Sequence, residues 1–131
     1  MKTVKQLALF LENKPGTLSK VCHVLAAAKI NLCAISISDA VDHAVVRIVV
    51  DEPNKTLHLL GEYGVLVVER DVLMIEGRNR PGELAEITAK LAKHKVNIEY
   101  AYSATPATAV TGAMILRVNN PKKAARILRG H

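Results

Sequence analysis

Apolar residues in the first half of the chain follow strand and helix periods in turn. Residues 4–11 form an apolar run typical of a strand, and apolar positions then recur at helical spacing over 17–29. Thr17 is the predicted N-cap of this helix, and Asn31 is predicted to end it. The further elements expected here are strands at 32–38, 44–50 and 65–68, a polar turn at 39–43, and a short helix over 54–63. The order is strand, helix, strand, strand, helix, strand.

The second half repeats this pattern but stops before a last strand. Its expected elements are a strand at 72–75, a helix with the inward stripe Leu84, Ile87, Thr88 and Leu91, strands at 98–104 and 111–118, and a helix that opens at Asn120-Pro121. Its first strand would then be an open sheet edge, which proteins usually cover. Either strand 65–68 pairs on both sides, through a hairpin at Glu69-Arg70-Asp71, or a second chain covers the edge.

The two halves also repeat individual residues at a fixed distance. Asn13-Lys14-Pro15-Gly16 returns as Asn79-Arg80-Pro81-Gly82, an offset of 79 − 13 = 66. Ile30-Asn31-Leu32 returns as Val96-Asn97-Ile98, and 97 − 31 is again 66. Pro53 aligns with Pro121 at 68, so two extra residues lie in the second hairpin, near 105–108. A self-match at one period indicates a duplicated unit.

This order and this repeat predict an α+β fold of two ferredoxin-like βαββαβ repeats, residues 1–70 and 71–131. The sheets are expected to be antiparallel with helices on one face, and the second repeat lacks its last strand. A unit of roughly 60 residues buries only about 60% of its unfolded surface. We therefore expect the repeats to share an interface that both need.

Composition narrows the possible function classes. No uninterrupted apolar run approaches the roughly 18 residues that span a bilayer, so we expect a soluble, cytoplasmic protein. Cys22 and Cys33 match neither a close metal-ligand spacing nor a disulfide pattern, and we expect no metal and no cofactor. The formal net charge is +6, with basic residues gathered near 122–129. These could meet nucleic acid or an acidic partner, although a solvated helix face is the more ordinary interpretation.

The repeated Asn-Lys/Arg-Pro-Gly segment has a chemistry of its own, because it lies between a strand and a helix in both halves. Proline fixes φ and glycine permits unusual backbone angles, so the segment predicts a tight turn into a helix. A helix start presents unpaired N–H groups and partial positive charge, which suit a carboxylate or phosphate. Asn13 and Asn79 add amide groups there, unless they only form Asx-turns. Asn31 and Asn97 are either further contacts or plain helix-ending residues.

The pattern Asn-Lys-Pro-Gly-x-Leu, about ten helical residues and then Ile-Asn-Leu resembles the ACT domain, a regulatory module that binds small molecules, over nearly the whole chain. The resemblance implies that the units sense amino acids, pair side by side and bind ligand between paired units. It implies the following ligand-binding residues: Asn13, Pro15, Gly16, Asn31, Asn79, Pro81, Gly82 and Asn97. Some members place a histidine where this chain has Leu11 and Gly77, which leaves the preference for a ligand side chain open.

We therefore expect a non-catalytic sensor that binds a free amino acid, or a similar small carboxylate, at the interface of the two repeats. It is expected to form a homodimer and to regulate amino-acid metabolism through a separate enzyme or regulator. The main alternative is a structural adaptor without a ligand. An RNA-binding sheet is less favoured, because strands 44–50 and 113–118 carry no aromatic residue for base stacking. Neither a metal site nor a catalytic nucleophile beside a base is evident.

Overall fold

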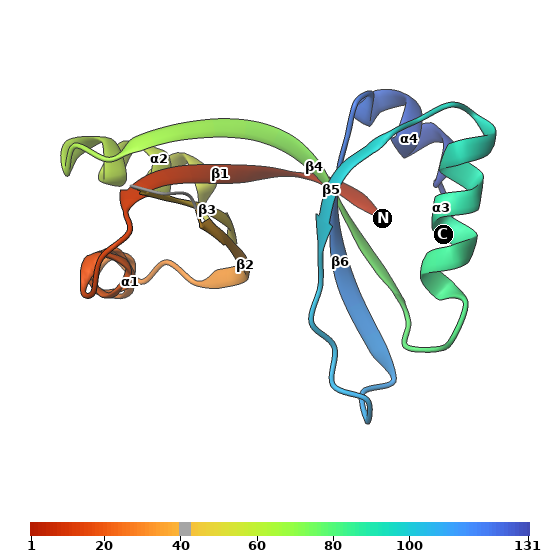
Figure 1. Ribbon diagram of the computed structural model, residues 1–131, viewed down its shortest axis with the longest axis horizontal. Helices are drawn as coiled ribbons and strands as arrows, with labels where there is room; N and C mark the ends of the chain where they lie inside the picture. Colours follow the sequence, from red (N-terminus) through yellow and green to blue (C-terminus); the bar gives the residue numbers. More distant parts are fainter. Residues whose placement is uncertain (40–42) are drawn as a thin grey trace. The chain divides into compact units, whose positions relative to one another are not determined.

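The computed structural model describes residues 1–39 and 43–131, so part of the expected polar turn at 39–43 lies outside the described residues. The elements in chain order are β1 (Lys2–Glu12), α1 (Thr17–Ala27), β2 (Leu32–Asp39), β3 (His43–Val50), α2 (Pro53–Glu62), β4 (Leu66–Arg78), α3 (Glu83–Lys93), β5 (Ile98–Tyr102), β6 (Thr111–Val118) and α4 (Pro121–Ile127) (Figure 1). The expected α+β, ferredoxin-like organisation is confirmed, with the strands in the order β2-β3-β1-β4-β6-β5.

The chain forms two compact units. One consists of Lys5–Arg70, and the other of Met1–Val4 together with Asp71–His131. In the first unit β3 pairs antiparallel with both β1 and β2, and in the second β6 pairs antiparallel with both β4 and β5. The first four residues therefore belong with the second repeat rather than with the first.

The expected hairpin at Glu69-Arg70-Asp71 is wrong, because β4 runs without interruption from Leu66 to Arg78. The segment contains no glycine or proline to favour a turn. β4 is also hydrogen-bonded to β1 in the sheet, and Lys5 Nζ lies 3.4 Å from Glu69 Oε1. A polar stretch that remains paired continues a strand as readily as it ends one.

The start of β1 lies in the second unit and borders β4 there, in place of the expected hairpin; cover of the remaining edge by a second chain stays a prediction. β1 is the neighbour of β4 on the side away from β6. The start of β1 belongs to the second unit, and Met1 packs against that unit's core. Met1–Val4 therefore adds to the second unit, where β1 borders β4.

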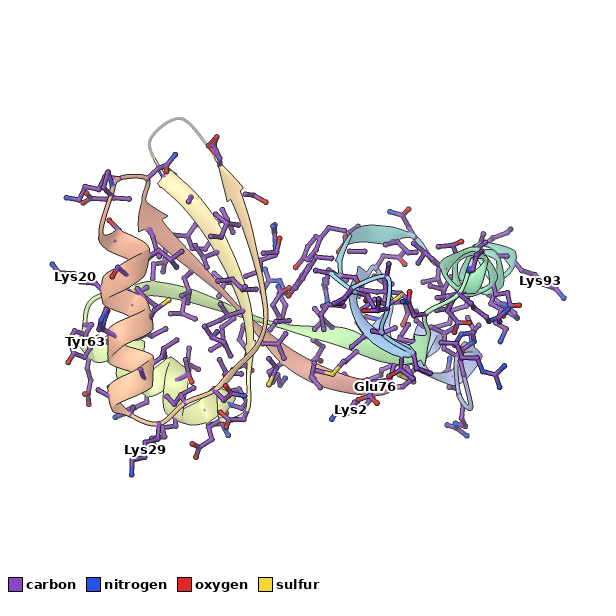
Figure 2. All side chains as sticks on the ribbon, turned by 90° about the horizontal axis from the view of Figure 1, so that it is seen from below. Lys2, Lys20, Lys29, Tyr63, Glu76 and Lys93 are labelled. Atoms are coloured by element: carbon purple, nitrogen blue, oxygen red, sulfur yellow. The ribbon has the colours of Figure 1, made fainter. Side chains whose placement is uncertain are left out.

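Each unit has its own apolar core between its helices and its strands; Figure 2 shows side chains filling this space beside α1. The fully buried residues of the first core include Leu7, Leu9, Leu25, Ile48 and Leu60, and those of the second include Leu73, Ile75, Ile87, Leu91, Leu116 and Leu128. The prediction that Leu84 belongs to the inward stripe of its helix is wrong, because Leu84 is 50% exposed. It lies in the first turn of α3, at the margin of the core.

Leu91 and Leu84 lie on the same helix and provide a matched test of these cores. Leu91→Ala should lower the free energy of unfolding by about 2–5 kcal/mol, because it leaves a cavity at a fully buried site. Leu84→Ala should cost less than about 1 kcal/mol, since the side chain is half exposed. Urea unfolding of both variants measures the difference, and equal losses would contradict the assigned core.

Candidate functional site

The two Pro-Gly loops fold alike. Gly16 has φ 91° and Gly82 has φ 92°, and each caps the helix that follows. The predicted N-cap Thr17 is therefore wrong; it is the first residue of α1, and the cap is Gly16. The positive φ turns the chain sharply enough for the carbonyl of Gly16 to accept the amide of Lys20 at 3.0 Å, as that of Gly82 accepts the amide of Glu86 at 3.0 Å.

Neither helix start has a side-chain cap. Because the first amides of a helix have no partner within the helix, they are available to an anion unless the protein supplies one. The loops therefore have the backbone geometry that the repeated motif predicts. What each start can bind depends on the side chains around it.

Asn31 and Asn97 lie at the other ends of the helices. Asn31 does not end α1 by its own conformation; Lys29 has the positive φ, 60°, and Lys95 the equivalent 59°. The backbone N–H of Asn31 donates to Asp51 Oδ1 at 3.0 Å, and Asp51 N–H donates back to the Asn31 carbonyl at 3.2 Å. Asn97 and Asn119 form the same pair at 3.0 and 3.1 Å. These bonds hold the start of one strand to the end of the next.

One repeat does not bring its two asparagines together. The 11 residues of α1 lie between Asn13 and Asn31, a rise of roughly 16 Å. In Figure 2, Lys29 marks the end of α1 that is remote from the Pro-Gly loop. Asn79 and Asn97 are separated by α3 in the same way. A single small ligand cannot touch both asparagines of the same repeat.

Asn13 and Asn79 instead reach toward the hairpin that follows the second strand of their repeats. Asn79 Nδ2 donates to the carbonyls of Ala109 at 2.8 Å, Pro106 at 3.0 Å and Ala107 at 3.4 Å, and its backbone N–H donates to Val110 at 2.9 Å. Asn13 Nδ2 has a longer contact, 3.5 Å to Asp39 Oδ1. The Asn79 amide donors are thus occupied in holding the longer second hairpin, and its contacts are not those of an Asx-turn.

Each loop borders a pocket in the same place. The first-loop pocket, of about 400 Å³, and the second-loop pocket, of about 530 Å³, share positions at the offset of 66. The shared pairs are Phe10 and Glu76, Leu11 and Gly77, Glu12 and Arg78, Lys14 and Arg80, Thr17 and Glu83, Lys20 and Glu86, Gly64 and Gly130, and Val65 and His131. The backbone is duplicated, but most of the side chains differ.

The first-loop pocket combines cations with an apolar wall. Lys14 and Lys20 line it, and the first turn of α1 contains no acidic residue. Glu12 is its one carboxylate and lies 2.9 Å from Lys14 Nζ. The hydrogen bond and charge of Lys14 hold the Glu12 pKa below its usual value. Leu11 and Val65 are apolar, so the pocket offers a positive helix start beside a hydrophobic surface.

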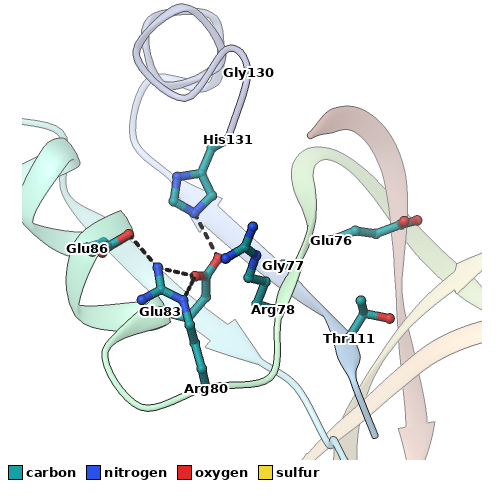
Figure 3. Close-up of a pocket in the computed structure, with 9 residues that line it drawn as sticks. All are labelled: Glu76, Gly77, Arg78, Arg80, Glu83, Glu86, Thr111, Gly130 and His131. Atoms are coloured by element: carbon teal, nitrogen blue, oxygen red, sulfur yellow. Dashed lines mark hydrogen bonds and ion pairs between the residues drawn. The ribbon is translucent and has the colours of Figure 1, made fainter.

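The second-loop pocket is lined by a charged network centred on Glu83 (Figure 3). The Glu83 side chain is 10% exposed, and its carboxylate accepts from Arg80 Nε at 3.1 Å and from His131 Nε2 at 3.1 Å. Arg80 Nη2 also lies 3.0 Å from Glu86 Oε2. Burial raises the Glu83 pKa, but the hydrogen bond from His131 and the charge of Arg80 outweigh it, and the pKa lies below its usual value.

Gly77 makes room for this carboxylate. A Cβ at position 77 would lie 2.6 Å from Glu83 Oε2, which is closer than real Cβ contacts allow. Matching residues between the two repeats do not reveal the network, because its members are positions at which the repeats differ. Those mismatches could have revealed it: Leu11 is replaced by Gly77, and Thr17 by Glu83, inside an otherwise matched segment.

Comparison with known proteins identifies the architecture. A sequence profile of the ACT domain pair matches residues 2–129, which confirms the resemblance inferred from the repeated motif. The crystal structure of protein BT0572 from Bacteroides thetaiotaomicron is similar at 35% identity and a TM-score of 0.91, covering 97% of this chain and 87% of that one. No curated protein sequence matches.

Two less similar structures share the fold. The regulatory subunit of aspartate kinase from Thermus thermophilus, in a ligand-free form, has 20% identity and a TM-score of 0.70, over 98% of this chain and 95% of that one. The corresponding subunit from Thermus flavus has 20% identity and a TM-score of 0.59, over 97% and 94%. Within residues 1–39 and 43–131, no helix is long and apolar enough to cross a membrane. In the same ranges, no group of three or more His, Cys, Asp and Glu could hold a metal ion.

Because the Glu83 pKa is lowered by folding, Glu83 should stabilise the folded state only while it is ionised. The contribution is present above the unfolded carboxyl pKa of about 4.3 and is lost as the pH falls through the lower folded value. The difference in unfolding free energy between the parent and E83Q should therefore shrink from about pH 6 to about pH 3. Urea unfolding at fixed ionic strength measures it; a constant difference would contradict the network.

Asn79→Ala should loosen the second hairpin, because it removes the donors to three carbonyls. We expect a loss of about 1 kcal/mol in the free energy of unfolding and faster amide exchange at Ala109. Asn13→Ala is the matched control in the other repeat and should cost less than about 0.5 kcal/mol, since its one described contact is long. Similar effects of the two changes would show that the Asn79 contacts do not hold the hairpin.

Proposed function

Because the chain belongs to the ACT domain pair family, we propose that it is a non-catalytic sensor that binds a free amino acid, or a similar small carboxylate, at the start of α1. The observation that carries this proposal is the first-loop pocket, where a helix start without a side-chain cap meets Lys14 and Lys20. The regulatory subunits of aspartate kinase share this fold, which favours a regulatory role.

The pocket has a group for each part of an amino acid. The first-turn amides of α1 and the two lysines suit a carboxylate, since partial and full positive charge converge there. Glu12 is available to an ammonium group at the same rim, at the expense of its contact with Lys14. The apolar Leu11 and Val65 suit a small hydrophobic side chain. Pro15 and Gly16 line the pocket and set the backbone that presents the amides.

We further propose that the protein works as a homodimer. β2 is the last strand in the sheet order, and Ile35 and Ile37 on it are 44% and 50% exposed. They are in register with the buried Ile48 and Val46 of β3, so the helix-side face of the sheet extends to an apolar edge. Asn31 directly precedes this strand. If a second copy pairs along the β2 edge, the Asn31 side chain of that copy could contact a ligand bound to the first copy.

Regulation would follow from linkage. A ligand that binds one arrangement of the protein more tightly shifts the population toward it, and a separate enzyme or regulator that reads this arrangement responds. Asn79, Pro81, Gly82 and Asn97 are the second-repeat equivalents of the proposed contacts. A structural adaptor without a ligand is the competing function.

A thermal-shift screen against the twenty amino acids tests the sensor. At about 100 times its Kd, a ligand should add roughly 2.7 kcal/mol to the free energy of unfolding. Lys20→Gln should weaken binding of the responding amino acid about twofold to fivefold, because an exposed ion pair contributes up to about 1 kcal/mol.

Lys93→Gln is the control, since Lys93 is exposed and lines neither loop pocket. It should bind like the parent. A flat response of the parent to all twenty amino acids would favour the structural adaptor.

A further inference from the structure

The two helix starts offer the same backbone to a ligand but different surroundings. The loops match in φ at Gly16 and Gly82 and in the hydrogen bonds that close the first turn. They differ in charge: the first turn of α1 has no acidic residue, while that of α3 has Glu83 and Glu86. Any difference in binding between the loops must therefore come from these side chains.

We propose that Glu83 is an internal carboxylate that closes the second loop, so that the chain takes its carboxylate ligand at the first loop only. This inference rests on the proposed function for the first loop. It makes Glu83 the residue that decides which of the two repeats can bind a ligand.

Glu83 occupies the place and the partners that an incoming carboxylate would need. Its carboxylate holds Arg80 at 3.0 Å and His131 at 3.1 Å, two of the three cationic or N–H side chains that line the pocket, the third being Arg78. A negative charge in the first turn also interacts favourably with the helix dipole. A second carboxylate would meet like charge from Glu83 and Glu86 and would find Arg80 already engaged.

The packing around Glu83 fits this role. Its side chain is 10% exposed and that of His131 is 9%, so the pair forms a buried contact and not a loose surface one. The carboxylate lies over Gly77, where the first repeat has Leu11. The differences at these three positions therefore act together. Gly77 leaves space, the Glu83 carboxylate lies in that space, and His131 donates a hydrogen bond to the carboxylate.

Site-resolved NMR titration tests the closure directly. Acetate supplies a carboxylate alone and glycine the smallest amino acid, each added against sodium chloride at equal ionic strength. In the parent, the backbone amides of residues 17–20 should shift and those of 83–86 should not. In E83T, which places the first-repeat residue beside Arg80 and His131, the initial slope of the 83–86 shifts against acetate should rise at least about fivefold.

E86Q is the matched control, because Glu86 also contacts Arg80 but is exposed; its 83–86 amides should respond much less than those of E83T, since Glu83 still holds Arg80 and His131. E83Q keeps the side-chain size while removing the charge, and it replaces E83T as the test variant if E83T loses a dispersed spectrum. A gain in E83Q or E83T supports closure by Glu83.

The inference is overturned if the parent 83–86 amides respond as those of 17–20 do, or if the folded Glu83 variant gains no response. Silence of residues 17–20 toward acetate, glycine and all twenty amino acids would overturn the proposed function instead. In that case a gain at 83–86 in E83T would still support the closure, and its absence would overturn that too.

Discussion

The left-handed turn at Gly16 and Gly82 is the constraint on which the rest of the structure depends. A side chain at φ near +90° is strained, so only glycine lets the strand turn within a few residues into a helix. The turn fixes where the first amides of α1 and α3 point, and it leaves them without a side-chain cap. It also places the preceding lysine or arginine beside the helix start. The candidate site is a consequence of this backbone.

Duplication of that backbone did not produce two equal sites. In the first repeat Leu11 belongs to the core and the helix start is bordered by lysines. In the second, the loss of a side chain at Gly77 leaves space that a carboxylate of the same chain fills. A buried carboxylate is costly unless cations and donors satisfy it, and Arg80 and His131 do so. The first repeat thus retains a solvent-open helix start, while the second contains a satisfied internal network.

Two strands take part in both compact units of the chain. β1 and β4 each contribute to both compact units, so the second unit includes residues from the start of the chain. The chain could not be cut between its repeats without exposing the edge of β4.

The sequence by itself determined most of the elements, their order and the two loops, because hydrophobic period and Pro-Gly chemistry are local properties that act over a few residues. It missed the continuity of β4, since whether Glu69-Arg70-Asp71 turns or stays extended depends on β1, which is distant in the chain. The resemblance implied ligand contact for four asparagines and left other roles open, and their positions at opposite ends of α1 and α3 separate the two of each repeat. Only the tertiary structure brought Glu83, Arg80 and His131 together, because a contact across 48 residues of sequence leaves no periodic signal.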